Sequence, residues 1–349
     1  MKIIEANFGS LHSKTIKSYT VKTDRGMELT CIDYGCIITS IHVPDKKGNS
    51  ENIVLGFDSI NDYLNHSPYF GCTIGRNAGR IKDAVFQLDG VAYSLQKNDG
   101  ENNLHSGSNG FHNVIWDTTV IQKSTDEVKI IFSYTSPDGE GGFPGDLKTT
   151  VMYTINNSNQ LIISYDAICD QKTLVNLTNH TYFNLSGNLK RTIVDHELTL
   201  KSDYFLELDN QFIPTCRKIP VDGTVFDFRK GRKILEGTKS EHPQTRIVGG
   251  GYDHPFLLNA NHQHEILLAD RESGRKIEIE TDELCVILYT GNSLSPDFKI
   301  RGKQSEKHLG VCLETQKPPN MIDHPEFPTL ILEANQPYQT KTTYSFYSK

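Results

Sequence analysis

The 349-residue chain lacks long apolar runs, and no stretch approaches the ~18 apolar residues that a membrane-spanning helix requires. Its first residues, Met1 to Asn7, also lack the apolar segment and the small-residue cleavage site of a secretory signal peptide. These absences argue against a membrane protein and against a secreted one. We therefore expect a cytoplasmic protein that has no membrane partner.

A basic surface is missing as well. Lysine and arginine number 36 against 43 aspartate and glutamate residues, which gives a net charge of -7, and neither sign is gathered in a long block. Proteins that bind nucleic acid or an anionic membrane carry a concentrated basic patch. Neither partner is expected, and a small molecule is the natural ligand for such a chain.

Cysteine is present in a pattern that does not match a structural role. The seven cysteines are an odd number and include no C-x-x-C pair, which argues against a disulfide framework and against a structural zinc site. We expect reduced and mostly buried thiols.

Long helical periodicity is equally scarce, and only residues 58–64 are expected to form a helical turn or two. No βαβ alternation and no linker is visible, so the pattern predicts one large antiparallel all-β domain over residues 1–349. The turn-rich segments 98–113 and 136–146 are expected to be loops that carry binding groups. Short runs typical of β-strands lie between Gly, Asn, Asp and Pro clusters, at residues 28–34, 128–135, 161–167, 276–280 and 284–289.

The most informative segment is N-L-T-N-H-T-Y-F-N-L, residues 176–185, which reads as a β-strand with one polar face. Side chains alternate along a strand, and a row of hydrogen-bonding groups centred on a histidine suits a hydroxyl-rich ligand. A competing interpretation is the solvent-facing side of an antiparallel sheet, which alternates in the same way. The side chains expected on the polar face are Asn176, Thr178, His180, Tyr182 and Asn184.

Further polar groups stand in otherwise apolar or glycine-rich surroundings, and Glu314 is the most unusual of them. It ends the apolar run L-G-V-C-L-E at residues 309–314, where a carboxylate costs free energy unless it is paired or lies at the wet edge of a sheet. Acids perturbed in this way are candidates for function. The other islands are G-R-N-A-G-R-I at 75–81, N-L-H-S-G at 103–107 and G-Y-D-H-P-F at 251–256.

Taken in this order and spacing, the islands resemble the aldose 1-epimerase family, also called galactose mutarotases, over nearly the whole chain. The resemblance implies a large antiparallel β-sandwich with a sugar-binding cleft. It also implies an enzyme that interconverts the α and β anomers of free aldoses such as galactose and glucose, without metal, nucleotide or other cofactor. It rests on 75–81, the Asn-x-Leu-His loop ending at His105, G-G-F-P-G at 141–145, the segment 176–185, Y-D-H at 252–254, Y-T-G-N at 289–292 and L-E-T-Q at 313–316.

The same resemblance implies roles for individual residues. His180 matches the general acid and Glu314 the general base, while Arg80, His105 and Asp253 match residues that hold the hydroxyls and the ring of the sugar. To open a pyranose ring, the C1 hydroxyl must lose a proton while the ring oxygen gains one. A carboxylate and an imidazolium on opposite sides of the hemiacetal would perform both transfers. Ordinary pKa values near 4.3 for Glu and 6.5 for His place the pair close to these charge states at neutral pH.

The chain departs from the family pattern at three places. Gly79 stands where many members have asparagine, and Ile287 stands where a glutamine is usual. One hydroxyl contact is therefore in question, which affects the choice of sugar more than catalysis. Residues 332–336 replace the usual Leu-x-Pro-Gly-Glu turn, and Asn335 is expected to adopt the left-handed backbone that glycine would adopt there.

Three other interpretations compete with this one. A non-catalytic carbohydrate-binding module would use aromatic platforms, yet Trp116 is the only tryptophan. A metal-dependent isomerase of the cupin type is indicated by H-Q-H-E at 262–265, although such sites place the glutamate several residues beyond the His-x-His pair. An epimerase of sugar 6-phosphates would need a cluster of cations around the phosphate, which the islands do not supply. The preferred sugar and the oligomeric state do not follow from the sequence.

Overall fold

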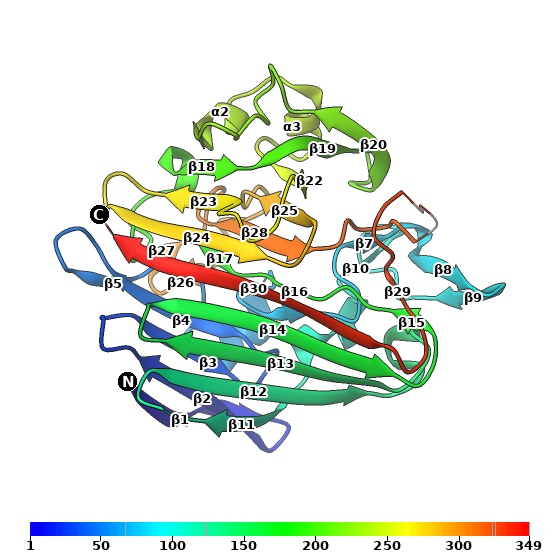
Figure 1. The fold of residues 1–349 in the computed structure, drawn as a ribbon, viewed down its shortest axis with the longest axis horizontal. Helices are drawn as coiled ribbons and strands as arrows, with labels where there is room; N and C mark the ends of the chain where they lie inside the picture. The colour runs from blue at the N-terminus through cyan, green and yellow to red at the C-terminus, as the bar shows by residue number, and fades with distance from the viewer. Residues whose placement is uncertain (67, 123, 323, 325, 349) are drawn as a thin grey trace.

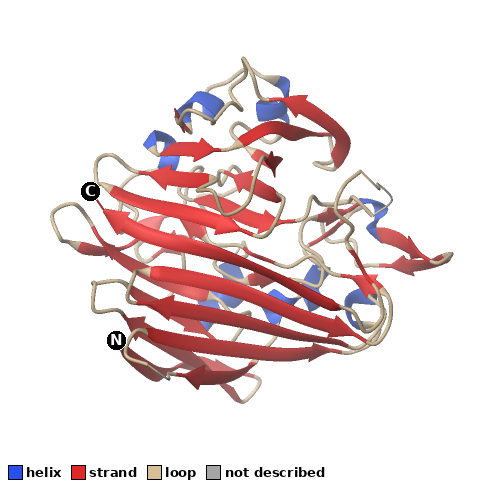
Figure 2. Ribbon diagram, in the orientation of Figure 1, coloured by secondary structure: helices blue, strands red, loops and turns tan. Residues whose placement is uncertain are grey.

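The computed structural model describes residues 1–66, 68–122, 124–322, 324 and 326–348, and strands dominate it (Figures 1 and 2). All strand ladders between the named strands of this part of the chain are antiparallel, as the sequence predicts. The five strand-like runs and the helical turn named above are each found within one or two residues of their expected ends. The large antiparallel all-β fold is thereby confirmed.

Nine strands form the largest sheet, which crosses the front of the molecule in Figure 1. The last strand of the chain lies between β14 and β24, so it joins the two halves of this sheet. The order is β11 (Asp117–Ile121), β12 (Glu127–Ser136), β13 (Leu147–Asn156), β14 (Gln160–Cys169), β30 (Pro337–Ser348), β24 (Arg275–Thr281), β23 (Ile266–Ala269), β18 (Glu197–Leu200) and β21 (Arg232–Lys233).

Two further sheets complete the sandwich, and side chains from all three sheets meet in one apolar core. One sheet runs β1 (Lys2–Leu11), β2 (Lys14–Lys22), β3 (Glu28–Ile32), β4 (Ile38–Pro44) and β5 (Ser50–Asn52). The other runs β17 (Tyr182–Phe183), β28 (Val311–Gln316), β25 (Cys285–Tyr289), β22 (Asp253–Leu258), β19 (Ser202–Leu208) and β20 (Pro214–Pro220).

Short ladders and helices connect these sheets. The helices are α1 (Ile60–His66), α2 (Leu235–Thr238) and α3 (Pro243–Ile247), and within the described residues no helix is long and apolar enough to cross a membrane. The two-stranded ladders are β6 (Thr73–Ile74) with β16 (Thr178–Asn179), β7 (Arg80–Ile81) with β10 (Asn103–Leu104), β8 (Val85–Leu88) with β9 (Val91–Ser94), β15 (Thr173–Leu174) with β29 (Ile331–Leu332), and β26 (Lys299–Ile300) with β27 (Lys303–Gln304).

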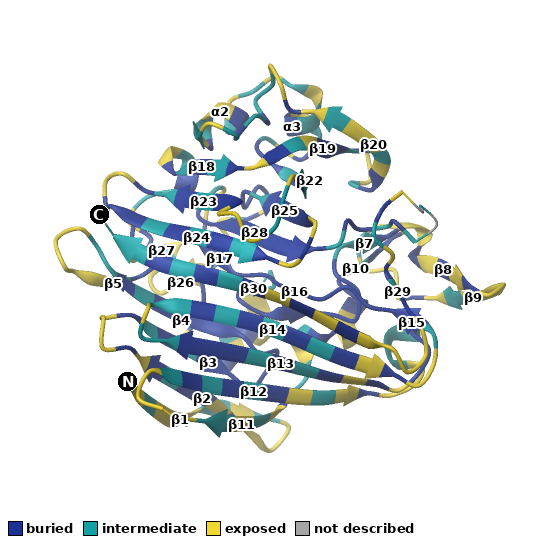
Figure 3. Ribbon diagram, in the orientation of Figure 1, coloured by how far each residue is buried: buried dark blue, intermediate teal, exposed yellow. Residues whose placement is uncertain are grey.

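The alternation of buried and exposed residues explains why most strands could be predicted from the sequence. Along β14, β24 and β30, buried residues alternate with partly or fully exposed ones, which gives the striped strands of Figure 3. One face of each strand therefore packs on the core and the other faces water. Strand β28 differs, because all six of its residues are buried. Glu314 thus lies in a strand that is covered on both faces.

The segment 176–185 is not the continuous strand that its alternation predicts. It is divided into a bridge at Asn176, the pair β16 and the pair β17, which bond to different partners. All of its residues are buried, so no solvent-facing row is present, while His180 and Tyr182 of the polar row line a cavity. Four of the five polar side chains donate to backbone carbonyls of neighbouring segments: Asn176 to Lys317, Thr178 to Thr315, Tyr182 to Pro68, and Asn184 to Leu309.

The prediction for the cysteines is confirmed. All seven are free, six are buried, and Cys216 is partly exposed. The C-terminal turn also behaves as expected, since Asn335 has a φ of 60° and its N–H donates to the carbonyl of Cys169 (2.7 Å).

Candidate active site

A cavity of about 280 Å³ is lined by three adjacent strands of the six-stranded sheet, β22, β25 and β28, and by loops from the first third of the chain. Antiparallel register places Pro255, Ile287 and Glu314 side by side across these strands. Side chains two residues apart on a strand share a face, so Asp253 lies on the same face as Pro255. This volume is near the lower end of the ~300–1,000 Å³ typical of ligand pockets, which suits a single small ring.

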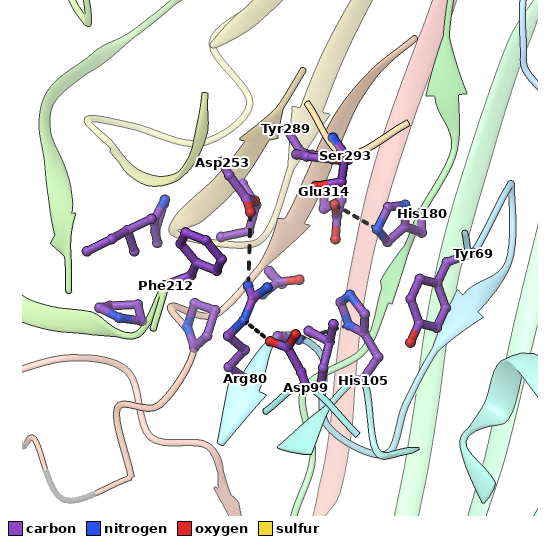
Figure 4. Close-up of a pocket in the computed structure, with 18 of the residues that line it drawn as sticks. Tyr69, Arg80, Asp99, His105, His180, Phe212, Asp253, Tyr289, Ser293 and Glu314 are labelled. Atoms are coloured by element: carbon purple, nitrogen blue, oxygen red, sulfur yellow. Dashed lines mark hydrogen bonds and ion pairs between the residues drawn. The ribbon is translucent and has the colours of Figure 1, made fainter. Parts of the chain in front are cut away.

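His180 and Glu314 meet at the floor of this cavity. The His180 Nε2 atom lies 3.4 Å from Glu314 Oε1, and the two side chains are only 6% and 4% exposed. Figure 4 shows the two groups side by side, joined by a dashed line. The two groups are in direct contact across this gap.

Burial controls the charge of both groups. It lowers the pKa of the His180 imidazole to about 3. Burial, followed by the charge of Asp253, raises the pKa of the Glu314 carboxyl well above its usual range, although Arg80 opposes this rise. Without a ligand the pair therefore favours neutral imidazole and neutral carboxyl. The ordinary pKa values of Glu and His do not apply at this site, because both groups are removed from water.

His105 lies beside this pair, with its ring centroid 5.4 Å from that of His180. The Gly79 N–H donates to His105 Nδ1 (3.1 Å), and burial lowers the pKa of His105 well below its usual value. The neutral ring therefore carries its one proton on Nε2. Gly79 makes this contact from a left-handed backbone (φ 78°), and a Cβ there would lie 2.6 Å from Pro319.

The fixed tautomer of His105 bears on metal binding. Each of His105, His180 and Glu314 offers one donor atom within 4.8 Å of the others, a spacing that a metal ion could bridge. With Nδ1 occupied by Gly79 and a proton on Nε2, the His105 ring has no free lone pair. The cluster is therefore better suited to donate to a hydroxyl oxygen than to hold a cation.

Arg80 occupies the opposite wall of the cavity, between two carboxylates. Its Nε atom lies 2.7 Å from Asp99 Oδ2, and its NH1 atom lies 4.0 Å from Asp253 Oδ2. The guanidinium also lies over the ring of Phe212, 5.2 Å from the centroid. These three neighbours, visible in Figure 4, hold the planar fork in one orientation facing the cavity.

Comparison with known proteins agrees with this geometry. Residues 17–345 match the family model described as aldose 1-epimerase. The galactose mutarotase of Bos taurus is 38% identical over 99% of both chains, and the aldose 1-epimerase of Streptococcus thermophilus is 34% identical over 95% of both. The crystal structure of galactose 1-epimerase from Lactobacillus acidophilus superposes with a TM-score of 0.88 at 28% identity, covering 99% of each chain. The chain belongs to the aldose 1-epimerase family. The sandwich fold implied by the resemblance is confirmed by the same superposition.

The structure brings together all five residues that the family resemblance singled out. His180, Glu314, Arg80, His105 and Asp253 line one cavity, although they come from five separate segments of the chain. Burial raises the pKa of Asp253, while Arg80 opposes the rise.

Other lining residues were missed, and they come from segments with weaker signals. Asp99 is in the turn-rich loop 98–113, but nothing in that loop indicates that it holds Arg80. Tyr69 packs edge-on against His105 (4.8 Å between centroids). Phe212 reaches the cavity from the β19–β20 turn, with a left-handed φ of 61°. The first arginine of the glycine-rich island, Arg76, does not line the cavity; it is buried and donates to Ser136 Oγ (2.8 Å).

The departures from the family pattern also have structural consequences. Ile287 lines the cavity next to Glu314, so an apolar side chain occupies the place of the usual glutamine. Leu208, Phe212, Pro214, Pro255 and Pro319 are further apolar residues that line the cavity. The cavity therefore offers apolar as well as polar contacts.

Features that supported the competing interpretations lie elsewhere. Trp116 is 2% exposed and donates to the Phe111 carbonyl, so it offers no platform to a sugar. Glu265 is fully buried and accepts from backbone N–H groups, including that of Thr281 (2.7 Å). His264 faces Glu278 on the surface instead. The H-Q-H-E segment is thus a turn that its own glutamate organises.

Proposed function

We propose that this protein interconverts the α and β anomers of free aldohexoses such as galactose and glucose, by acid–base opening and closing of the sugar ring. The observation that carries this proposal is the 3.4 Å contact between His180 Nε2 and Glu314 Oε1 at the floor of a small cavity. The names of the relatives, galactose mutarotase and aldose 1-epimerase, support the same reaction.

In the proposed reaction Glu314 takes the proton of the C1 hydroxyl while His180 Nε2 gives a proton to the ring oxygen. The bond between C1 and the ring oxygen breaks, and the bond between C1 and its hydroxyl oxygen becomes a carbonyl. Rotation about C1–C2 presents the other face of the aldehyde, and closure returns both protons. The two oxygens are carried by one carbon, so an acid and a base in mutual contact match their separation.

The His180–Glu314 pair already holds the number of protons that this reaction requires. Neutral imidazole with neutral carboxyl holds the same number of protons as imidazolium with carboxylate. The two forms differ only by a transfer between Glu314 Oε1 and His180 Nε2. Arg80 favours the carboxylate form because its charge lowers the pKa of Glu314. A sugar that displaces water and binds both groups would then select the reactive form.

The remaining residues are proposed to bind the sugar. His105 donates from Nε2, Arg80 donates from its fork, and Asp253 accepts from hydroxyl groups. Apolar lining residues such as Phe212 and Ile287 would contact C–H groups of the ring. The polar and apolar groups of the cavity would then both be used in binding the sugar.

A free sugar is a better substrate for this cavity than a sugar phosphate. Among the described residues that line it, Arg80 is the only lysine or arginine, and two carboxylates already engage it. A phosphate would meet the negative charges of Asp99 and Asp253 and would lack the cationic cluster that binds such groups. We also propose the cytosol as the place of action, because a set of free thiols is typical of a reducing compartment.

The purified protein is expected to accelerate mutarotation of freshly dissolved α-galactose or α-glucose without any added cofactor. Polarimetry measures the rate, and glucose 6-phosphate in parallel distinguishes the free sugar from its phosphate. Activity should be undiminished by EDTA, because the His180–Glu314 pair performs both proton transfers. Loss of activity on chelation that a divalent ion restores would contradict the metal-free mechanism, and faster turnover of glucose 6-phosphate would contradict the substrate.

A further inference from the structure

Cys312 contacts the ring nitrogen of His180 that the proposed reaction does not use. Its Sγ atom lies 3.5 Å from His180 Nδ1, and both side chains are buried. Cys312 is two residues before Glu314 on β28, so both side chains lie on the same face of that strand. One strand therefore supplies partners to both nitrogens of the same imidazole.

We propose that Cys312 is the positioning residue of His180: its sulfur accepts the Nδ1–H hydrogen bond and leaves Nε2 as the atom that exchanges protons. This inference rests on the proposed function, and it names a residue that acts through His180 without touching the sugar. Among the described side chains, that of Cys312 has a hydrogen bond to His180 Nδ1, and the backbone of His180 itself also contacts the ring and raises its pKa against the effect of burial.

Counting protons supports this orientation. In the proposed cycle the neutral pair holds the exchanged proton on Glu314, which lies 3.4 Å from Nε2, so the single ring proton is on Nδ1. When the pair is ionised, both ring nitrogens carry a proton. Nδ1 is protonated in both forms and needs an acceptor throughout the cycle. A sulfur at 3.5 Å is within reach of such a hydrogen bond.

Stacking alone does not fix which nitrogen faces Glu314. The ring of His180 lies against Tyr182 (5.0 Å between centroids, 28° between planes) and against Tyr69 (5.7 Å, 31°). These contacts hold the plane of the imidazole, but a 180° flip about the Cβ–Cγ bond preserves that plane. The contact with Cys312 at one edge distinguishes the two flip states.

Sulfur also suits the acid role of His180. A carboxylate at Nδ1 would stabilise the imidazolium and weaken it as an acid. A thiol is a weak acceptor, and burial, followed by the charge of Glu314, raises the pKa of Cys312 well above its usual value. The group therefore stays uncharged beside the imidazole and orients the ring without stabilising its charged form.

The experiment compares three variants of the full chain. Cys312→Ala removes the acceptor, Cys312→Ser replaces it with an oxygen of similar size, and Cys285→Ala removes a buried thiol from the neighbouring strand β25 as a matched control. We expect Cys312→Ala to lower kcat by about 3- to 10-fold, the effect of one ordinary hydrogen bond, with KM unchanged. Cys312→Ser and Cys285→Ala should retain the wild-type kcat.

The second readout is the ring N–H spectrum of ¹⁵N-histidine-labelled protein, which needs no sugar. The wild type should show a protected proton on His180 Nδ1, assigned by its loss in His180→Asn. This resonance should persist in Cys312→Ser and Cys285→Ala and disappear in Cys312→Ala. An active wild type whose Nδ1 is unprotonated, or a Cys312→Ala variant with both resonance and kcat intact, overturns the role of Cys312. A wild type that does not accelerate mutarotation overturns the proposed function itself.

Discussion

Replacing Glu314 with glutamine is expected to lower kcat by about 10²–10⁴-fold, the usual contribution of a general acid or base. Glutamine keeps the shape of the side chain but neither releases nor accepts the proton that the C1 hydroxyl must give up. His180→Asn should cause a fall of similar size, because it removes Nε2. Initial rates by polarimetry at saturating sugar measure the effect.

A matched control for these variants is Glu283→Gln. Glu283 is also a buried carboxyl, at 6% exposure, but it lies outside the cavity and contacts Tyr338. Its replacement should leave kcat at the wild-type value, which separates loss of the catalytic carboxyl from general disturbance of the core. Near-normal kcat in Glu314→Gln would remove Glu314 from the mechanism.

Replacing Arg80 with methionine is expected to lower kcat/KM by about 10- to 150-fold, which corresponds to the ~1.5–3 kcal/mol of a charged hydrogen bond. The substitution removes the fork that would bind the sugar, and it leaves Asp99 and Asp253 without their shared cation. It also removes the charge that lowers the pKa of Glu314, so kcat should fall together with the rise in KM.

Arg217→Met is the control for Arg80→Met, because Arg217 pairs with Glu207 but is 65% exposed and does not line the cavity. Asp253→Ala should by contrast act mainly through KM, if Asp253 only holds a hydroxyl. Steady-state kinetics with galactose distinguishes these patterns. Unchanged kcat/KM in Arg80→Met would show that the cation does not touch the substrate.

The sequence predicted those strands whose two faces meet different surroundings. In β14 and β24 the alternation of burial follows the alternation of apolar and polar residues. The same rule failed for residues 176–185, because every position in that segment is buried and its polar side chains bind backbone carbonyls. Alternation in a sequence identifies two faces of a strand only when one of the faces is solvated.

The five site residues came from the family resemblance, and their chemistry depended on contacts that the sequence does not encode locally. Asp99 holds Arg80 from a loop 19 residues away, and Gly79 sets the tautomer of His105 through a backbone N–H. Burial lowers the pKa of His180 and raises the pKa of Glu314, so the carboxyl has the higher pKa here, whereas the imidazole has the higher pKa in water. That effect needs the three-dimensional arrangement, since it arises when strands distant in the chain remove both groups from water.

The pH dependence of kcat/KM tests most directly the central claim that His180 and Glu314 act as one unit holding one proton. Initial mutarotation rates, corrected for the buffer-catalysed background, would be measured from about pH 4 to 9 in the wild type and in Glu314→Gln. Both the acid limb and the alkaline limb of the pH profile report titration of the His180–Glu314 pair as a unit. The acid limb marks uptake of a second proton and is displaced toward the pKa of about 3 that burial gives His180.

The alkaline limb marks loss of the only proton and is displaced upward, because burial raises the pKa of Glu314. We therefore predict a level profile through the region near pH 6.5 where an ordinary histidine titrates, and an alkaline limb that is absent from the residual activity of Glu314→Gln. A limb centred near that ordinary histidine pKa, unchanged in Glu314→Gln, would contradict the account.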